Sequence, residues 1–196
     1  MTGFILAGGK SSRMGCEKAL LPIGSHTLIE HVCQRLRPFV ERVVVVGNAH
    51  NAQFLRDVRS ADAVLIDLAP EHGPLMGIYT GLMHTETPLN LFVPCDMPWV
   101  EWRLVERLLR ACRDDVEAVA SLHPVEGVQP FPLVCDASAC RTIGALLDRG
   151  ERSLQALLRR PRTQLVTVDE PGLWQSFRNI NTLADYAKLA EATVAR

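Results

Sequence analysis

A loop rich in glycine and basic residues follows the first apolar run of the sequence. Residues 6–18 read Leu-Ala-Gly-Gly-Lys-Ser-Ser-Arg-Met-Gly-Cys-Glu-Lys, which places Arg13 and Lys18 in a loop with glycines at 8, 9 and 15. Glycine lets the backbone approach a phosphate closely, Arg offers a planar fork of N–H donors, and Lys offers a compact charge. The loop therefore has the chemistry to bind a nucleoside triphosphate or another polyanion.

Two common phosphate-binding motifs do not match this loop. A P-loop would need a glycine at position 4, where Phe4 stands, and glycines at 3, 8, 9 and 15 do not fit the Rossmann G-x-G-x-x-G pattern. The alternative is an ordinary solvated turn, in which Lys10 contributes only solubility. Two cations and a third glycine at defined spacing favour a binding loop over that turn.

Acidic residues follow two later apolar runs. Asp96 comes after the run at 89–93, and it is suited to hold Mg²⁺, which prefers oxygen ligands and bridges substrate phosphates. The same residue is equally suited to cap a helix that begins near Trp99. Asp67 follows the run at 63–66 and, taken alone, is a turn residue. The local sequence leaves both interpretations of Asp96 open.

The elements that must position these residues alternate between short apolar runs and amphipathic segments. The continuous run Val43–Val46 is typical of a parallel strand covered on both faces, and Leu28, Val32, Leu36 and Phe39 form one apolar face of a helix. We predict strands at 3–6, 43–46, 63–66, 89–93, 118–122 and 163–168. We predict helices at 27–39, 74–84, 100–112, 137–149 and 153–160, and a last one after Thr182, which forms a capping box with Asp185.

This alternation indicates an α/β fold with a mostly parallel central sheet and right-handed crossovers. In such sheets ligands bind beyond the carboxyl ends of the strands, and the first βα loop is the usual phosphate site. Prolines at 124, 130 and 132 interrupt the pattern and predict a loop with an edge or antiparallel strand. Because no internal repeat or Gly/Ser linker is present, a single domain is expected.

Composition excludes several classes of function. The 196 residues carry 21 basic and 22 acidic side chains, so no excess of cations is available for nucleic acid or an anionic membrane. The six cysteines include no C-x-x-C pair, no apolar run approaches the ~20 residues of a membrane span, and no signal-peptide core is present. We therefore expect a cytoplasmic protein without a disulfide framework. The six histidines show no metal-ligand spacing, and Trp99 and Trp102 are expected to be packing residues.

The signature L-A-G-G-x-x-x-R-M-G-x-x-K at 6–18 resembles that of the molybdenum cofactor guanylyltransferases. Further segments resemble this family in the same order along nearly the whole chain. They are Asp67 with Gly73-Pro74-Leu75-Met76-Gly77, Pro94-Cys95-Asp96-Met97-Pro98, Gln129-Pro130, Gly150-Glu151-Arg152 and Asn179-Ile180-Asn181-Thr182. The resemblance implies a three-layer, Rossmann-like nucleotidyltransferase fold.

The resemblance also implies a reaction and a site. GMP would pass from Mg²⁺-GTP to molybdopterin that carries molybdenum, giving molybdopterin guanine dinucleotide and pyrophosphate. The catalytic residues would be Arg13, Lys18 and Asp96, with Asp96 as the Mg²⁺ ligand. The nucleotide would be bound by Leu6, Ala7, Gly8, Gly9, Lys18, Asp67 and Asp96, with Asn48 near the base, and the acceptor would be bound by Asn179 and Asn181. Residues 1–122 would form a nucleotide-binding half and 123–196 an acceptor-binding half, and the resemblance leaves room for transient contact with cofactor-delivery proteins or molybdoenzymes.

The choice of substrates rests on few residues. Gly8-Gly9 favours GTP, since the related cytidylyltransferases read L-A-A-G. Two positions depart from the family pattern: Leu183 stands where the N-x-N-T-P motif has proline, and Pro132 interrupts an apolar strand segment. A molybdopterin cytidylyltransferase, a sugar-1-phosphate nucleotidyltransferase and a non-catalytic nucleotide-binding module are the alternatives.

Overall fold

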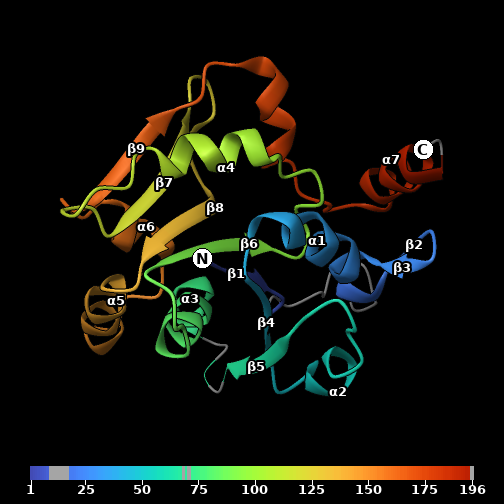
Figure 1. The fold of residues 1–196 in the computed structure, drawn as a ribbon, viewed down its shortest axis with the longest axis horizontal. Helices are drawn as coiled ribbons and strands as arrows, with labels where there is room; N and C mark the ends of the chain where they lie inside the picture. Colours follow the sequence, from blue (N-terminus) through green and yellow to red (C-terminus); the bar gives the residue numbers. More distant parts are fainter. Residues whose placement is uncertain (9–17, 68, 70–71, 195–196) are drawn as a thin grey trace.

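A seven-stranded sheet forms the centre of the molecule. The structure is a computed structural model and describes residues 1–8, 18–67, 69 and 72–194 (Figure 1). The strands follow the spatial order β5-β4-β1-β6-β8-β7-β9. Their bounds are β1 (Thr2–Leu6), β4 (Arg42–Asn48), β5 (Ala63–Asp67), β6 (Leu89–Pro94), β7 (Ala118–His123), β8 (Gly127–Asp136) and β9 (Thr163–Thr167), and a separate small hairpin pairs β2 (Pro22–Ile23) with β3 (His26–Thr27). The predicted strands are therefore confirmed.

The sheet is parallel except at one strand. β1 pairs in parallel with β4 and β6, β4 with β5, and β7 with β9, whereas β8 runs antiparallel to both β6 and β7. Of the two predicted alternatives, an edge or an antiparallel strand, the proline-rich segment forms the antiparallel strand, and it lies inside the sheet. Pro130 and Pro132 lie where the β7–β8 register shifts between Val119 and Ser121. A bulge tolerates residues that cannot donate to the ladder, which is why prolines fit inside this sheet.

Seven α-helices of the described chain complete the fold. They are α1 (Leu28–Leu36), α2 (Ala52–Leu55), α3 (Pro74–Met83), α4 (Trp102–Leu109), α5 (Ala139–Asp148), α6 (Leu154–Leu158) and α7 (Leu183–Val194), with 3₁₀ turns η1 (Lys18–Leu20), η2 (Arg37–Phe39) and η4 (Pro171–Phe177). The helices predicted from periodicity are present with shorter bounds. Figure 1 shows α7 and the β2–β3 hairpin at one end of the molecule.

Alternation along the strands divides the core into two layers. Val43 and Val45 face one side of the sheet, where they pack with residues of α1 and α4, while Val44 and Val46 face the other side, with residues of α3, α5 and α6. Successive side chains of a strand point to opposite faces, so a continuous apolar run is buried only between two layers of helices. The predicted three-layer α/β architecture is confirmed.

The helix predicted at 27–39 ends earlier than expected. Thr27 and Glu30 form a capping box at the start of α1, and α1 stops at Leu36 because Pro38 has no N–H to continue the helical ladder. Phe39 is consequently not on the buried face: it is 39% exposed and stacks on Trp102 with ring centroids 4.3 Å apart. The predicted capping box between Thr182 and Asp185 is confirmed at the start of α7.

The described cysteines, 33, 95, 112, 135 and 140, are free thiols, and Cys16 lies outside the described residues. Burial raises the pKa of the Cys33 thiol to about 12. A buried thiol with a raised pKa carries little thiolate and is chemically inert. Within the part of the chain that the structure describes, no helix combines the length and apolar composition needed to cross a membrane.

Candidate active site

The carboxyl ends of β1 and β6 lie side by side at the topological switch point of the sheet, where the order of the strands reverses. From β1 the chain builds outward through β4 to β5, and it then returns to the other side of β1 to form β6. The Cys95 N–H donates to the Leu6 carbonyl at 3.0 Å, so the two strand ends lie side by side. A crevice at such a switch point is the usual ligand site of an open α/β sheet. The predicted loop after β1 and the predicted Asp96 turn after β6 both begin here.

Lys18 and Asp96 come together at this edge. The Lys18 Nζ lies 3.1 Å from the Asp96 Oδ2, and their side chains are only 18% and 22% exposed. The same Nζ donates to the Asn181 Oδ1 at 3.4 Å. Three predicted site residues from positions 18, 96 and 181 are thus in contact, although they are far apart in the sequence.

Asp96 does not cap a helix. The helix expected near Trp99 begins only at Trp102, and its N-cap residue is Glu101. Residues 94–97 instead form a turn in which the Met97 N–H donates to the Pro94 carbonyl. The capping interpretation of Asp96 is therefore wrong, and its carboxylate faces Lys18.

The segment 178–181 is tied to the Asp96 turn. The Ile180 N–H donates to the Asp96 backbone carbonyl at 2.8 Å, and the Ile180 side chain is fully buried among Ile23, Leu28 and Leu189. Trp99 packs against this cluster, and the Arg178 guanidinium lies 5.7 Å from its ring centroid. Trp99 and Trp102 are therefore packing residues, as predicted. The buried isoleucine holds Asn181 against Lys18 and leaves Asn179 exposed beside the site.

Asp67 and Asn48 end the neighbouring strands β5 and β4 at the same edge. Asp67 is 3% exposed, and its Oδ1 accepts a hydrogen bond from the Ala69 N–H at 2.9 Å. That bond matches the turn residue expected from the local sequence. A nucleotide contact by Asp67 stays a prediction.

Asn51, which the sequence reasoning overlooked, forms a buried network with Asn48. The Asn51 Nδ2 donates to the Ala7 carbonyl at 2.7 Å, and the Asn48 Nδ2 donates to the Gly8 carbonyl at 2.9 Å. Asn48 and Asn51 are 5% and 1% exposed. The two asparagines three residues apart at the end of an apolar run were the available sequence signal.

Gly8 begins the glycine loop. A Cβ built on Gly8 would meet no atom of the described residues within 4 Å, and the φ of Gly8 is not in the left-handed region. Neither packing by those residues nor backbone conformation requires glycine there, which is consistent with close approach by a ligand. Gly9, Lys10 and Arg13 lie outside the described residues.

The donor set at this edge suits a hard cation that keeps water and phosphate ligands. Among the described residues, no group of three or more His, Cys, Asp or Glu side chains lies together as a metal site. Mg²⁺ is commonly held by one or two carboxylates together with substrate phosphates, rather than by a cage of protein ligands. A single half-buried carboxylate at Asp96 fits that pattern.

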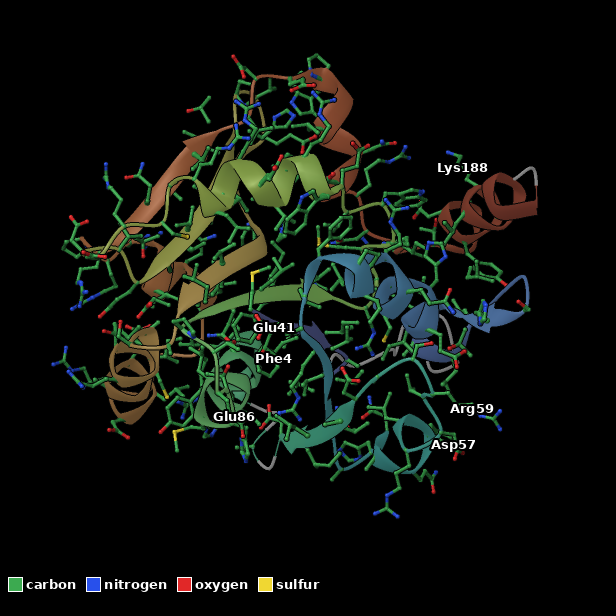
Figure 2. All side chains as sticks on the ribbon, in the orientation of Figure 1. Phe4, Glu41, Asp57, Arg59, Glu86 and Lys188 are labelled. Atoms are coloured by element: carbon green, nitrogen blue, oxygen red, sulfur yellow. The ribbon has the colours of Figure 1, made fainter. Side chains whose placement is uncertain are left out.

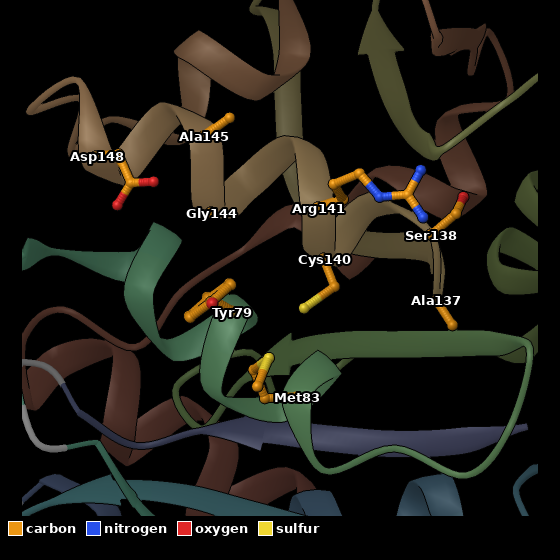
Figure 3. A pocket seen from close by; sticks show the side chains of 9 residues that line it. All are labelled: Tyr79, Met83, Ala137, Ser138, Cys140, Arg141, Gly144, Ala145 and Asp148. Carbon is orange, nitrogen blue, oxygen red and sulfur yellow. The ribbon is translucent and has the colours of Figure 1, made fainter.

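A separate pocket of about 570 Å³ lies between α3 and α5 (Figure 3). Tyr79 and Met83 of α3 face Cys140, Arg141 and Gly144 of α5 across it, and Ala137 at its rim donates its N–H to the Pro88 carbonyl just before β6. The start of β6 is the opposite edge of the sheet from Asp96. None of the predicted site residues lines this pocket.

Known proteins resemble this chain over nearly its whole length. The MobA-like NTP transferase domain matches residues 3–166. The molybdenum cofactor guanylyltransferase of Vibrio parahaemolyticus is 33% identical over 190 residues, covering 95% of this chain and 93% of that protein. The guanylyltransferase of Ralstonia nicotianae is 34% identical over 202 residues, covering 97% and 96%.

Solved structures share the fold. The molybdopterin-guanine dinucleotide biosynthesis protein A of Archaeoglobus fulgidus has a TM-score of 0.81 at 25% identity over 100% of both chains. A 4-diphosphocytidyl-2C-methyl-D-erythritol synthase from Anaerococcus prevotii has a TM-score of 0.75 at 13% identity, over 100% of this chain and 98% of that one. The second likeness concerns the fold alone.

Proposed function

This chain belongs to the MobA-like NTP transferase family, and we propose that it transfers GMP from GTP to molybdopterin that carries molybdenum. The products are molybdopterin guanine dinucleotide and pyrophosphate. The observation that carries the proposal is the contact of Lys18 with both Asp96 and Asn181. It joins the loop that would hold the triphosphate to the segment that would hold the acceptor, and the relatives named for this activity match over nearly all of the chain.

The reaction needs positioning and charge stabilisation more than acid–base chemistry. A terminal phosphate oxygen of the acceptor attacks the α-phosphorus of GTP, the new P–O bond forms, and the bond to the β-phosphate oxygen breaks as pyrophosphate leaves. A phosphate nucleophile is already ionised at neutral pH, so no general base is required. Lys18 and Arg13 would balance negative charge on the phosphates, an effect that is large in a site shielded from water.

Asp96 would hold Mg²⁺ on the phosphates of GTP. When bound, the cation would neutralise phosphate charge and orient the triphosphate. Lys18, which pairs with this carboxylate here, would lie close enough to contact a phosphate beside the cation.

Substitution of Asp96 tests this assignment. Asp96→Asn keeps the shape of the side chain and removes its charge, so we expect Mg²⁺-dependent pyrophosphate release to be lost while the thermal unfolding midpoint stays close to that of the wild type. Asp148→Asn, an exposed carboxylate in the α3–α5 pocket, is the control and should keep full activity. Wild-type activity in Asp96→Asn would remove the metal assignment.

Pyrophosphate release measured with each of the four NTPs, with and without molybdopterin, tests the function as a whole. We expect release only with GTP and only when the acceptor is present. Release with CTP instead would identify a cytidylyltransferase, and turnover of a sugar 1-phosphate would identify a sugar nucleotidyltransferase. Binding of GTP without turnover would identify a nucleotide-binding module.

We also propose that different parts of the chain bind the nucleotide and the acceptor. Residues 1–122 would bind the nucleotide, with Leu6, Ala7, Gly8, Gly9 and Asp67 around it, and residues 123–196 would bind the acceptor through Asn179 and Asn181. The pair Gly8-Gly9 supports GTP through its resemblance to the L-A-G-G signature of the guanylyltransferases. Location in the cytoplasm and transient contact with proteins that deliver or receive the cofactor stay predictions.

A further inference from the structure

We propose that the buried pair Asn48 and Asn51 is a positioning device for the nucleotide. Asn51 holds the Ala7–Gly8 peptide in its strand direction, with the Gly8 N–H toward the side of β1 on which Asp96 lies, and Asn48 turns the Gly8 carbonyl back toward β4. The inference rests on the proposed function, because the group that the Gly8 N–H would bind is a phosphate of the NTP. Neither asparagine is a catalytic residue in this view. Both act through the backbone that they hold.

The two amides hold two successive carbonyls on the same side of β1. Ala7 bonds to the β4 side twice: its N–H donates to the Val46 carbonyl at 2.8 Å and its carbonyl accepts from the Asn51 Nδ2 at 2.7 Å. In a continuing strand the Gly8 carbonyl would point the other way, toward β6. Instead the Asn48 Nδ2 holds it on the β4 side at 2.9 Å. The strand alternation is thus broken at Gly8, and the loop begins.

The direction of the Gly8 N–H follows from peptide geometry. Among the described residues the one cis peptide is Phe131–Pro132, so the Ala7–Gly8 peptide is trans. In a trans peptide the N–H points opposite to the carbonyl. The Ala7 carbonyl points to Asn51 on the β4 side, and the Gly8 N–H therefore points toward β6, whose turn carries Asp96. A backbone N–H aimed there can donate a charge-assisted hydrogen bond to a phosphate oxygen.

The asparagine network is fixed because its other polar groups are also paired. The Asn51 Oδ1 accepts from the Asn48 N–H at 2.8 Å, and the Asn48 Oδ1 accepts from the N–H groups of His50 and Asn51 at 2.9 and 3.2 Å. A Cβ on Gly47 would lie 2.8 Å from the Asn51 Oδ1, so only glycine leaves room for this amide. Buried amides whose polar atoms are hydrogen-bonded resist rotation, because rotating the side-chain amide would leave a buried polar group without a partner.

Four substitutions to Asp separate positioning from mere stability. Asn48→Asp and Asn51→Asp keep the shape of the side chain and its accepting oxygen, but they replace the Nδ2 donor to the Gly8 or Ala7 carbonyl with a charged oxygen that repels that carbonyl. Ala49→Asp, at an exposed position between them, adds the same charge without touching the loop. Asn90→Asp removes a buried amide donor, to the Thr87 carbonyl at 3.1 Å, at the opposite edge of the sheet.

The dissociation constant for Mg²⁺-GTP, measured calorimetrically, is the binding readout. We expect the dissociation constants of Asn48→Asp and Asn51→Asp to be at least tenfold higher than that of Ala49→Asp. Asn90→Asp should lower the thermal unfolding midpoint but leave the dissociation constant unchanged. Should either Asp variant fail to fold, the uncharged Asn51→Ala variant replaces it. An increase no larger than that of Ala49→Asp would overturn the proposal.

Crystal structures of the nucleotide-free Asn48→Asp and Asn51→Asp variants are the second readout, and they do not depend on activity. We expect the peptide groups at Ala7 and Gly8 to rotate away from their present direction. Unmoved peptides in both variants would overturn the positioning role even if GTP binding weakened. If the wild type bound no NTP, the proposed function would fall, while these structures would still decide whether the asparagines set the loop.

Discussion

Lys18 is the residue at which the parts of the site meet. Its Nζ contacts a carboxylate that follows β6 and an amide that precedes α7, and its side chain is only 18% exposed. A partly buried cation holds its place more firmly than a solvated one, because water screens it less. The sequence predicts that Lys18 belongs to a phosphate-binding loop. Its contact with Asn181 joins two residues that are 163 positions apart and could not be predicted locally.

Substitution of Lys18 should weaken the use of GTP. Lys18→Ala removes a charge-assisted contact worth about 1.5–3 kcal/mol, so we expect kcat/KM for GTP to fall about 10- to 150-fold. Lys188→Ala removes an exposed lysine on α7 and is the matched control (Figure 2). Both kcat and KM are measured by pyrophosphate release. A kcat/KM of Lys18→Ala equal to that of the wild type would show that the loop is misassigned.

At the scale of elements, α3 packs on the sheet through a glycine. Phe4 of β1 and Phe92 of β6 stack with ring centroids 4.9 Å apart, and α3 approaches their rings at Gly81. A Cβ on Gly81 would lie 2.8 Å from the Phe92 Cε1 and 3.1 Å from the Phe4 Cδ1. The glycine therefore sets how closely this helix can cover β1 and β6, the strands that carry the site.

Gly81→Ala should destabilise the protein. Overpacking costs about 1–3 kcal/mol, and the better helix propensity of Ala returns about 1 kcal/mol. The difference is a net loss of up to about 2 kcal/mol in the free energy of unfolding, and because both rings are buried we expect a value near the upper end. Urea titration measures it, with Gly172→Ala, whose Cβ would meet nothing within 4 Å, as the control. A Gly81→Ala variant as stable as the wild type would mean that α3 can shift freely.

Asp62 links η2 to β4 and makes the stability of this link depend on pH. Its carboxylate accepts hydrogen bonds from the Arg37 guanidinium at 2.5 Å and from the Val43 N–H at 2.7 Å. The Arg37 hydrogen bond, helped by the Val43 N–H and the charge of Arg37, outweighs burial and lowers the pKa of Asp62 in the folded protein. A lowered folded-state pKa stabilises the fold above the unfolded-state pKa of about 3.9.

Asp62→Asn should therefore lose stability at neutral pH and lose less in acid. The contribution of the charged Asp62 disappears as the pH falls through its lowered pKa, where the protonated acid resembles the amide. We expect the gap in the free energy of unfolding between wild type and variant to be larger at pH 7 than at pH 3. Asp57→Asn, an exposed neighbour, should show no such change (Figure 2). A gap that is constant with pH would contradict the role of this ion pair.

For the whole molecule, β8 joins the two halves of the sheet. It lies between β6 and β7 although it follows both in the chain. Leu133 and Cys135 of β8 pack with Phe4, Val44 and Phe92 on one face of the sheet, and Val134 packs with residues on the other face. Residues 1–122 and residues 123–196 therefore share one core.

The chain should unfold as one cooperative unit. Far-UV circular dichroism and the fluorescence of Trp99, Trp102 and Trp174 should give coincident urea transitions. Residues 1–122 alone should show no cooperative transition, because β6 and β7 lose the strand between them. Two separated transitions in the full chain would show that the halves are independent.

The sequence by itself determined the elements and the type of site. Apolar runs, helical periodicity and capping residues act locally, so the strands and the capping box at Thr182 could be predicted from neighbouring residues, while the phosphate loop stays a prediction. The order of the motifs determined the family. Helix ends, such as that of α1 before Pro38, were predicted less accurately because the last turn depends on packing.

Only the tertiary structure decided where β8 lies and which residues meet at the site. A strand interrupted by proline suits an edge unless a bulge accommodates it, and the bulge arises from pairing with a distant strand. The two interpretations of Asp96 were locally equal, and the structure excluded capping because the next helix begins only at Trp102 with Glu101 as its N-cap. The spacing of Asn48 and Asn51 after an apolar run was the one local signal of this pair, and the contact of Asn51 with a carbonyl 44 residues away could come only from the tertiary structure.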